Sequence, residues 1–296
     1  MKKRLFSYII IMTLIIVTSL TGCGSGKDSK DTESVTATNP QTDSESTTGE
    51  EESTQAQTES EDVELTLFIA ASLANVMEEI QGMYAEVAPN VTLIFNADSS
   101  GTLQTQIEEG ATCDIFFSAA TKQMTALQES GYVVEDTVIN LLENQVVLIK
   151  AAGAETQVTG FEDITNASSL ALAGEDVPVG SYAREIFTSL GNIDDVMAME
   201  INEGANVTAV LTAVSEMSNE IGVVYATDAA SMSDTVEVIA TAPEGSLSPA
   251  VYPVGQIANA EATQAGLDAT IAFLEYLTTD EVLKVFENYG FTIYMK

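Results

Sequence analysis

The spacing of apolar residues changes repeatedly along the chain, and each change marks the start of a new element. From residue 63 apolar and polar residues alternate and then become continuously apolar, which is typical of a strand entering a buried sheet. Leu73, Val76, Met77 and Ile80 follow at helical spacing. The pattern predicts strands at 63–69, 91–95, 114–118, 145–150, 169–173, 221–225 and 236–240, with helices that include 182–190 and 207–217.

The alternation of strands and helices continues to the end of the chain. A capping-box pattern at residues 278–281 predicts the start of the last helix, and Gly290 its end. Alternating β and α segments favour an α/β fold with parallel sheets. The length from residue 63 onward suits two lobes better than one core.

The first residues have the features of an export signal. Lys2, Lys3 and Arg4 precede an apolar stretch at 5–20, which is shorter than a spanning helix requires. The stretch ends in Leu20-Thr21-Gly22-Cys23, which resembles the lipobox of bacterial lipoproteins. We therefore expect a lipoprotein signal peptide at 1–22 and membrane attachment through a lipid on Cys23. A plain signal peptide with an incidental cysteine is the alternative.

Residues 23–62 are dominated by Ser, Thr, Asp, Glu and Gln. Such a segment cannot bury enough apolar surface to fold by itself. We expect a disordered acidic tether that holds the folded part away from the membrane.

Composition removes several classes of function. The chain has 45 acidic and 10 basic residues, and this negative charge disfavours nucleic acid as a partner. Histidine is absent, which removes Ser-His-Asp catalysis and histidine zinc ligands. With Cys23 lipidated, Cys113 has no partner for an intramolecular disulfide, and its apolar surroundings predict a buried, inert thiol.

Small residues gather where predicted strands give way to helices. The junctions are Ala70-Ala71-Ser72-Leu73, Asp98-Ser99-Ser100-Gly101-Thr102 and Pro178-Val179-Gly180-Ser181. Free backbone N–H groups at a helix start can hold an anion without a cation. The alternative is that Ser72 and Ser100 are only helix N-caps.

Two further segments belong with these junctions. Residues 204–208 open a helix with free amides, and Tyr225 ends a strand with a hydroxyl, although it could also be a half-buried packing residue. In this order the motifs resemble the periplasmic molybdate-binding family over nearly all of residues 63–296. The segments that carry the resemblance are 70–73, 99–110, 114–119, 177–183, 206–207, 222–225 and 289–292.

The resemblance implies a two-lobed type II periplasmic binding protein fold with the ligand in the interlobe cleft. Lobe I would comprise 63–143 and 243–296, and lobe II 144–242. The family's motifs imply that Ser72 and Ser100 bind the oxyanion through hydroxyls and amides. By the same correspondence, Val179 and Val207 would contribute backbone amides, and Tyr225 its hydroxyl.

The function implied is capture of molybdate or tungstate outside the cytoplasm and delivery to an ABC permease with its ATPase. The protein would be a monomer without a cofactor, without protein ligands to a metal and without enzymatic activity. Val179, Ala120 and Thr208 depart from the residues common in the family; Thr208 replaces a frequent arginine.

Other ligands and activities stay open on the sequence alone. Sulfate and phosphate are alternatives, and Asp98 could accept the proton that phosphate retains. A serine-based hydrolase is another alternative, but the chain contains neither the G-x-S-x-G motif nor a histidine to activate a serine. A binder of cations or amino acids would use the many carboxylates, but no paired Arg and Asp stands at the junctions.

Overall fold

Two mixed β-sheets organise residues 61–294, the part of the chain that the computed structural model describes. The first sheet, with its helices, is called lobe I, and its strand order is β11-β4-β10-β3-β1-β2. Its strands are β1 (Val63–Ala70), β2 (Val91–Asp98), β3 (Ile115–Phe117), β4 (Ile139–Asn144), β10 (Ala250–Gln256) and β11 (Thr292–Ile293).

The second sheet, with its helices, is called lobe II, and its strand order is β7-β6-β8-β5-β9. The strands are β5 (Val146–Ala151), β6 (Leu170–Ala173), β7 (Ile201–Gly204), β8 (Ile221–Tyr225) and β9 (Val236–Thr241). The chain passes from lobe I to lobe II at Gln145, between β4 and β5. It returns through residues 242–249, between β9 and β10.

The expectation of parallel sheets holds only for part of each sheet. β1 runs parallel to β2 and β3, but β10 runs antiparallel to β3 and β4. In lobe II, β5 runs antiparallel to β8 and β9. The reason is that β5 and β10 enter their sheets directly from the other lobe, whereas a parallel neighbour needs a crossover connection within the same sheet.

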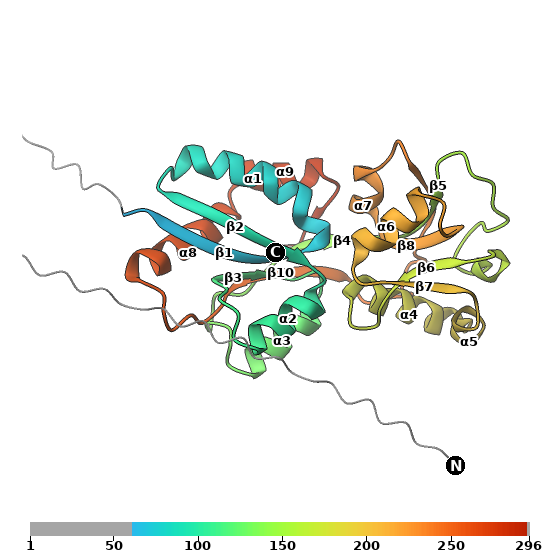
Figure 1. The fold of residues 1–296 in the computed structure, drawn as a ribbon, viewed down its shortest axis with the longest axis horizontal. Helices are drawn as coiled ribbons and strands as arrows, with labels where there is room; N and C mark the ends of the chain where they lie inside the picture. The colour runs from blue at the N-terminus through green and yellow to red at the C-terminus, as the bar shows by residue number, and fades with distance from the viewer. Residues whose placement is uncertain (1–60, 295–296) are drawn as a thin grey trace, which may run out of the picture. The chain divides into compact units, whose positions relative to one another are not determined.

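Helices cover both faces of each sheet (Figure 1). In lobe I, α1 and α9 lie on one side in this view, and α2 and α3 on the other; in lobe II, α6 and α7 lie opposite α4 and α5. The lobe I helices are η1 (Ala71–Leu73), α1 (Ala74–Val87), α2 (Ser100–Glu108), α3 (Thr121–Glu129), α8 (Gln264–Tyr276) and α9 (Asp280–Asn288). The lobe II helices are η2 (Ile164–Asn166), α4 (Pro178–Leu190), α5 (Ile193–Met197), α6 (Val207–Ser215) and α7 (Ala226–Ser231).

The last helix begins one residue later than the capping-box pattern predicts, and the box does not form. Its N-cap is Thr279, which makes no capping hydrogen bond with its side chain. The box would have used the hydroxyl of Thr278, but this hydroxyl donates to the carbonyl of Glu275 in α8. The close succession of α8 and α9 therefore takes the hydroxyl that the box would have used.

Cys113 is buried beneath α2 and α3, as its apolar neighbours predicted. Its side chain is 2% exposed and packs in a cluster with Phe68, Leu103 and Phe116. The thiol donates to the carbonyl of Ile115 at 3.2 Å, and burial raises its pKa well above the usual value. A thiol in this state is a poor nucleophile.

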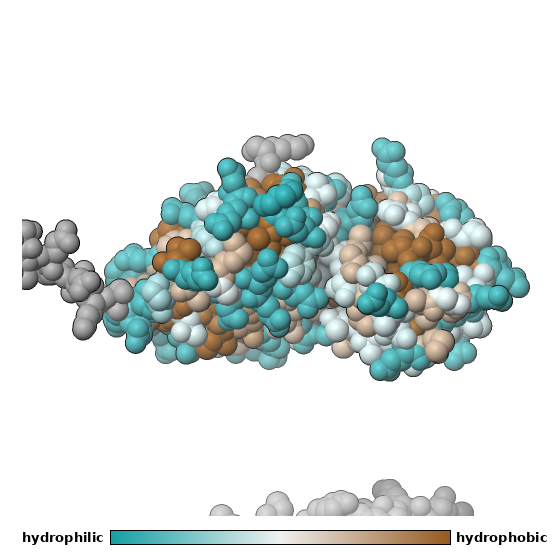
Figure 2. Space-filling view, turned by 90° about the horizontal axis from the view of Figure 1, so that it is seen from above, coloured by the Kyte–Doolittle hydropathy of each residue, from teal (hydrophilic) through white to brown (hydrophobic). Residues whose placement is uncertain are grey.

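The visible surface is mainly hydrophilic, with small apolar patches on both lobes (Figure 2). Large exposed apolar side chains within residues 61–294 stand on different segments of the chain: Val87, Ile94, Met197, Met217, Val238 and Ile271. Isolated apolar residues of this kind are normal on a protein surface. No helix in the described range is long and apolar enough to cross a bilayer. Cys23, the predicted site of lipidation, and the tether lie outside the described residues.

Candidate functional site

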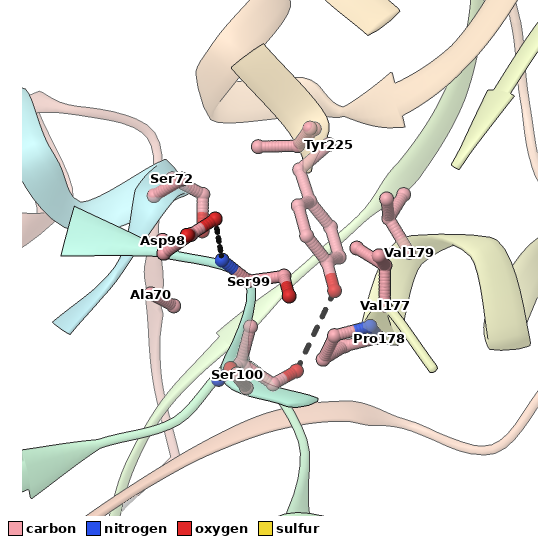
Figure 3. Close-up of a pocket in the computed structure, with 12 residues that line it drawn as sticks. Ala70, Ser72, Asp98, Ser99, Ser100, Val177, Pro178, Val179 and Tyr225 are labelled. Carbon is pink, nitrogen blue, oxygen red and sulfur yellow. Dashed lines mark hydrogen bonds between the residues drawn. The ribbon is translucent and has the colours of Figure 1, made fainter. Parts of the chain in front are cut away.

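The five residues predicted to bind a ligand line one pocket between the lobes (Figure 3). Ser72 and Ser100 come from lobe I, whereas Val179, Val207 and Tyr225 come from lobe II. The rest of the lining is small or apolar except for Asp98 and Ser99: Ala70, Ala71, Asp98, Ser99, Ala119, Val177 and Pro178. Strand-to-helix junctions that are far apart in the sequence thus meet at one place.

Ser100 is the first residue of α2, and its hydroxyl is not the helix cap. The N-cap is Ser99, whose Oγ accepts a hydrogen bond from the amide of Thr102 at 3.1 Å. The Ser100 Oγ instead accepts from the amide of Ala119 at 2.9 Å. A hydroxyl that accepts from one amide still has its own proton to donate. Ser100 can therefore serve as a donor toward the pocket.

Ser72 lies in η1, the short turn that follows β1. The N-cap of η1 is Ala70 and that of α1 is Leu73, so the alternative that Ser72 is an N-cap was wrong. Its Oγ lies 2.9 Å from the hydroxyl of Tyr252, which is on β10. The side chain of Ser72 is therefore oriented by a residue of another strand rather than by its own turn.

Val179 and Val207 present main-chain rather than side-chain groups. Val179 is the second residue of α4 and Val207 the first of α6, so both amides belong to the free N–H groups of a helix start. Their side chains are 1% and 4% exposed, because they pack into lobe II. Within residues 61–294 neither amide donates a hydrogen bond to a main-chain or side-chain acceptor. Both are available as donors with the positive end of a helix dipole behind them.

Tyr225 ends β8 and points across the pocket toward the segment of Ser100 (Figure 3). Its side chain is 1% exposed, and its hydroxyl donates to the carbonyl of Ala119 in lobe I at 3.5 Å. Burial raises the pKa of the phenol well above its usual value, with a further contribution from the nearby Tyr252. The hydroxyl therefore keeps its one proton, which it donates to Ala119 here at the long distance of 3.5 Å and can turn toward a bound anion.

Asp228 lies beneath Tyr225 in the first turn of α7. The amide of Tyr225 donates to its Oδ2 at 3.3 Å. Burial raises the pKa of Asp228 to about 7, and the hydrogen bond from the Tyr225 amide lowers it only in part. Lobe II therefore carries, near the pocket, a carboxyl group whose pKa lies near neutral pH.

Asp98 and Asn206 form a contact between the lobes that the sequence did not reveal. Asp98 Oδ1 accepts from the amide of Ser99 at 2.7 Å and from Asn206 Nδ2 at 3.0 Å. Asn206 Oδ1 accepts from the amide of Ala209, which fixes the orientation of the side-chain amide. The two residues are separated by 108 positions, so no local motif could have paired them.

The lobes also meet at Gly101, close to the pocket. A Cβ added at Gly101 would collide with the main-chain carbonyl of Asp176, which lies in the loop before α4. Glycine is thus required at this position by the close approach of lobe II.

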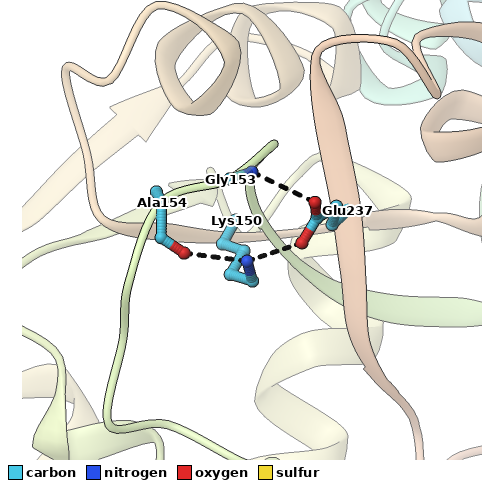
Figure 4. Close-up of polar contacts among 4 residues, drawn as sticks. All are labelled: Lys150, Gly153, Ala154 and Glu237. Carbon is cyan, nitrogen blue, oxygen red and sulfur yellow. Dashed lines mark hydrogen bonds and ion pairs between the residues drawn. The ribbon is translucent and has the colours of Figure 1, made fainter.

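The basic residues of the described region are engaged away from the pocket lining or stand outside it. Lys150 donates to the carbonyl of Ala154 at 2.8 Å and pairs with Glu237 at 2.6 Å (Figure 4). Arg184 donates to the carbonyls of Ala173 and Gly180, and Lys284 pairs with Glu287. Residues 61–294 also contain no group of His, Cys, Asp and Glu that could hold a metal ion.

The pocket is small, and its hydroxyls, helix-start amides and phenol are hydrogen-bond donors. About 210 Å³ of space, part of it open to solvent, lies between the lining residues. This space suits an ion of a few atoms rather than an amino acid or a peptide. Hydroxyls, helix-start amides and a protonated phenol can together hold a small anion that offers only acceptors.

Comparisons with known proteins agree with this geometry. Residues 65–292 match the family described as bacterial extracellular solute-binding protein. The Bacillus subtilis protein named "Putative ABC transporter substrate-binding lipoprotein YvgL" is 37% identical over 80% of this chain and 90% of its own length. The molybdate-binding protein ModA of Haemophilus influenzae is 35% identical over 77% of this chain and 89% of its own.

A solved structure gives the same result. The "substrate binding domain of putative molybdenum ABC transporter from Clostridium difficile" is 36% identical and covers 78% of this chain and 98% of its own, with a TM-score of 0.59. The resemblance carried by the motifs and the expected two-lobed α/β fold are thereby confirmed.

Proposed function

Because the chain belongs to the family of bacterial extracellular solute-binding proteins, we propose that it captures molybdate and delivers it to an ABC permease and its ATPase. The chain is a solute-binding protein of a transport family rather than an enzyme, which sets aside the serine hydrolase. The relatives from B. subtilis and H. influenzae, which are matched over about nine tenths of their own lengths, carry transporter and molybdate-binding names.

One observation supports the ligand class most directly. Two hydroxyls, two helix-start amides and a protonated phenol, contributed by both lobes, converge on a pocket with no basic side chain in its lining. A fully deprotonated tetrahedral oxyanion has only acceptors, so a site made of donors matches it. We assign Ser72, Ser100, Val179, Val207 and Tyr225 as the binding residues.

Size and protonation favour molybdate, with tungstate as an equivalent ligand. Sulfate has the same charge but shorter bonds, so some donors of a rigid pocket would stay unpaired around it. Each unpaired buried donor costs about 1–3 kcal/mol. Phosphate retains a proton at neutral pH and needs an acceptor. Asp98 is the one carboxylate in the lining, and two hydrogen bonds hold its Oδ1, which leaves Oδ2 as the carboxylate oxygen that phosphate could use.

Capture would occur by closure of the lobes about the two crossings at Gln145 and 242–249. The expected lobes, 63–143 with 243–296 and 144–242, meet within a few residues of these crossings, although Asn144, as the last residue of β4, belongs to lobe I. The protein would act as a monomer on the outer side of the cell membrane, anchored by a lipid on Cys23. Replacement of Cys23 by serine should release the protein from the membrane fraction.

A thermal-unfolding screen tests the ligand. A ligand that binds only the folded state raises the melting temperature as its concentration passes the dissociation constant. We expect strong stabilisation by molybdate and tungstate, little by sulfate and none by phosphate. Equal stabilisation by sulfate would refute the molybdate assignment but keep the oxyanion class. Stabilisation by an amino acid or a metal cation, with none by any oxyanion, would refute both.

A further inference from the structure

A chain of hydrogen bonds, called here the line, connects Thr227 of lobe II with Ser72 through buried side chains of lobe I. Asn144, the last residue of β4, donates from Nδ2 to Thr227 Oγ1 at 2.8 Å and to the hydroxyl of Tyr252 at 3.2 Å. The Tyr252 hydroxyl in turn lies 2.9 Å from Ser72 Oγ. Asn144, Tyr252 and Thr227 are 5%, 0% and 7% exposed, so these polar groups depend on one another rather than on solvent.

The direction of this line follows from the hydrogen-bonding capacity of each group. Asn144 Oδ1 accepts from the amide of Gln145 at 2.9 Å, which places the NH₂ group toward Thr227 and Tyr252. The oxygen of Tyr252 is therefore an acceptor toward Asn144. Its own proton needs another acceptor, because an unpaired buried hydroxyl is costly. Ser72 Oγ is within hydrogen-bonding distance and meets that need.

The hydroxyl of Tyr225 is the competing acceptor. The rings of Tyr225 and Tyr252 pack edge to face with centroids 5.6 Å apart, and the proximity of Tyr252 contributes to the raised pKa of Tyr225. A hydrogen bond between the two hydroxyls also contributes to this rise in pKa, so Tyr225 competes directly with Ser72 for the proton of Tyr252. The Tyr252 hydroxyl lies 2.9 Å from Ser72 Oγ and 3.2 Å from Asn144 Nδ2. When Tyr252 donates to Ser72, the proton of Ser72 is free to point into the pocket.

We propose that Tyr252 is a positioning residue, which donates to Ser72 Oγ and so directs the Ser72 proton toward the bound oxyanion, while Asn144 sets the direction of the line. This inference rests on the proposed binding of an oxyanion by Ser72. It assigns a binding role to two residues outside the pocket lining. Through Thr227 it also ties the orientation of a lobe I donor to lobe II.

The test is a double-mutant cycle on the full chain, with molybdate affinity measured by calorimetry. Tyr252→Phe should weaken binding roughly three- to tenfold, the usual range for one hydrogen bond. In a Ser72→Ala background the same change should cost less than about twofold, because the group through which it acts is gone. Tyr289→Phe is the matched control, since its hydroxyl bonds only to Glu79 on the surface, and it should bind like the wild type.

Each outcome separates the inference from the proposed function. If Tyr252→Phe binds like the wild type, the positioning role is refuted and the proposed function stands. If it weakens binding equally with and without Ser72, but not in a Tyr225→Phe background, the proton goes to Tyr225 and the inference is wrong. If the wild type binds no oxyanion, both fail.

Asn144→Leu provides a second variant should Tyr252→Phe unfold, which melting without ligand would reveal. It removes the donor that sets the direction, so it should also weaken molybdate binding only while Ser72 is present. A loss of the same size in the Ser72→Ala background would refute the inference.

Discussion

On the lobe I side of the pocket the side-chain donors are serine hydroxyls, whereas on the lobe II side the donors are helix-start amides and a phenol. Ser72 and Ser100 are each held by a hydrogen bond from elsewhere in the fold. Val179 and Val207 are held by the packing of their side chains, and their amides face no acceptor among residues 61–294. The donors of lobe I therefore depend on which residue is present, whereas the two amides of lobe II depend only on where the backbone lies.

The junction of the two sides at Gly101 should give the largest effect on binding. Gly101→Ala places a Cβ against the Asp176 carbonyl, so the lobes must separate and donors from both cannot reach one ion. We expect molybdate affinity to fall at least a hundredfold, about 3 kcal/mol. Gly82→Ala is the control: Gly82 lies in α1 with open space around it. It should leave affinity unchanged and add about 0.5–1 kcal/mol of stability. If calorimetry gives Gly101→Ala the affinity of the wild type, the close contact between Gly101 and Asp176 is not part of the bound state.

The buried acid of lobe II has no counterpart in lobe I, and this difference should appear in the pH dependence of stability. Burial raises the pKa of Asp228 to about 7 in the folded state, above the ordinary value of 3.8. Between these values the unfolded chain releases a proton that the folded chain keeps. Its contribution to the free energy of unfolding is therefore complete below about pH 4 and is lost as the pH rises to about 7, on the order of a few kcal/mol.

Asp228→Asn should remove this component, so that the variant gains stability relative to the wild type as the pH rises from 4 to 8. Urea unfolding across that range measures the difference. Asp163→Asn should instead give a curve parallel to that of the wild type from pH 4 to 8 and approach it only below about pH 4, because hydrogen bonds from Thr159 lower the pKa of Asp163 below its ordinary 3.8. Its stabilisation is present above the ordinary pKa and is lost as the pH falls. Parallel curves for the wild type and Asp228→Asn would show that Asp228 is already charged.

On the lobe I side, replacing a hydroxyl should weaken binding directly. Ser100→Ala removes a donor to the ion and the acceptor for the Ala119 amide, which should cost about 1–3 kcal/mol, or roughly ten- to a hundredfold in affinity. Thr263→Ala removes a true helix cap at α8. It should cost about 1 kcal/mol of stability without changing affinity. If calorimetry gives both variants the affinity of the wild type, Ser100 is structural only.

On the lobe II side, the side chain should matter less than the amide. Val207→Pro removes the N–H at the first position of α6, where proline is tolerated, and Asn206 before it is already extended, with φ −154° and ψ 178°. We expect a loss of about tenfold in molybdate affinity, the value of one hydrogen bond. Val207→Ala keeps the amide and should bind within about twofold of the wild type. Equal molybdate affinities for the two variants would show that the Val207 amide does not bind the ligand.

The same contrast explains how much the sequence could predict. Ser72 and Ser100 stand out because small hydroxyl residues at strand-to-helix junctions suggest anion binding. Val179 and Val207 could be identified only through the family motifs, because a backbone donor leaves no mark on residue type. The contacts Asp98–Asn206 and Asn144–Tyr252 each span 108 positions and follow from no local pattern.

The fold shows a similar limit. Most central strands were predicted by their apolar runs, but the strands β4, β7, β10 and β11 and the helices α5, α7 and α8 were not. β10 contains Pro253 and Gly255, which argue against a central strand. The structure accommodates the proline at an irregularity in the pairing with β4, between Tyr252 and Pro253. α4 begins at Pro178 rather than near residue 182, because proline suits the first turn of a helix.

A pocket lining without a basic side chain has a consequence for the rate of capture. The chain carries a net charge of −35, so an approaching dianion is repelled at long range and attracted only at contact. In 0.1 M salt the repulsion is largely screened at distances beyond about 10 Å. The attraction between the ion and the donors inside the pocket is screened far less. Association should therefore become faster as ionic strength rises, the reverse of the behaviour of a cation-lined site. Such a carrier would gather its ligand most rapidly in saline surroundings.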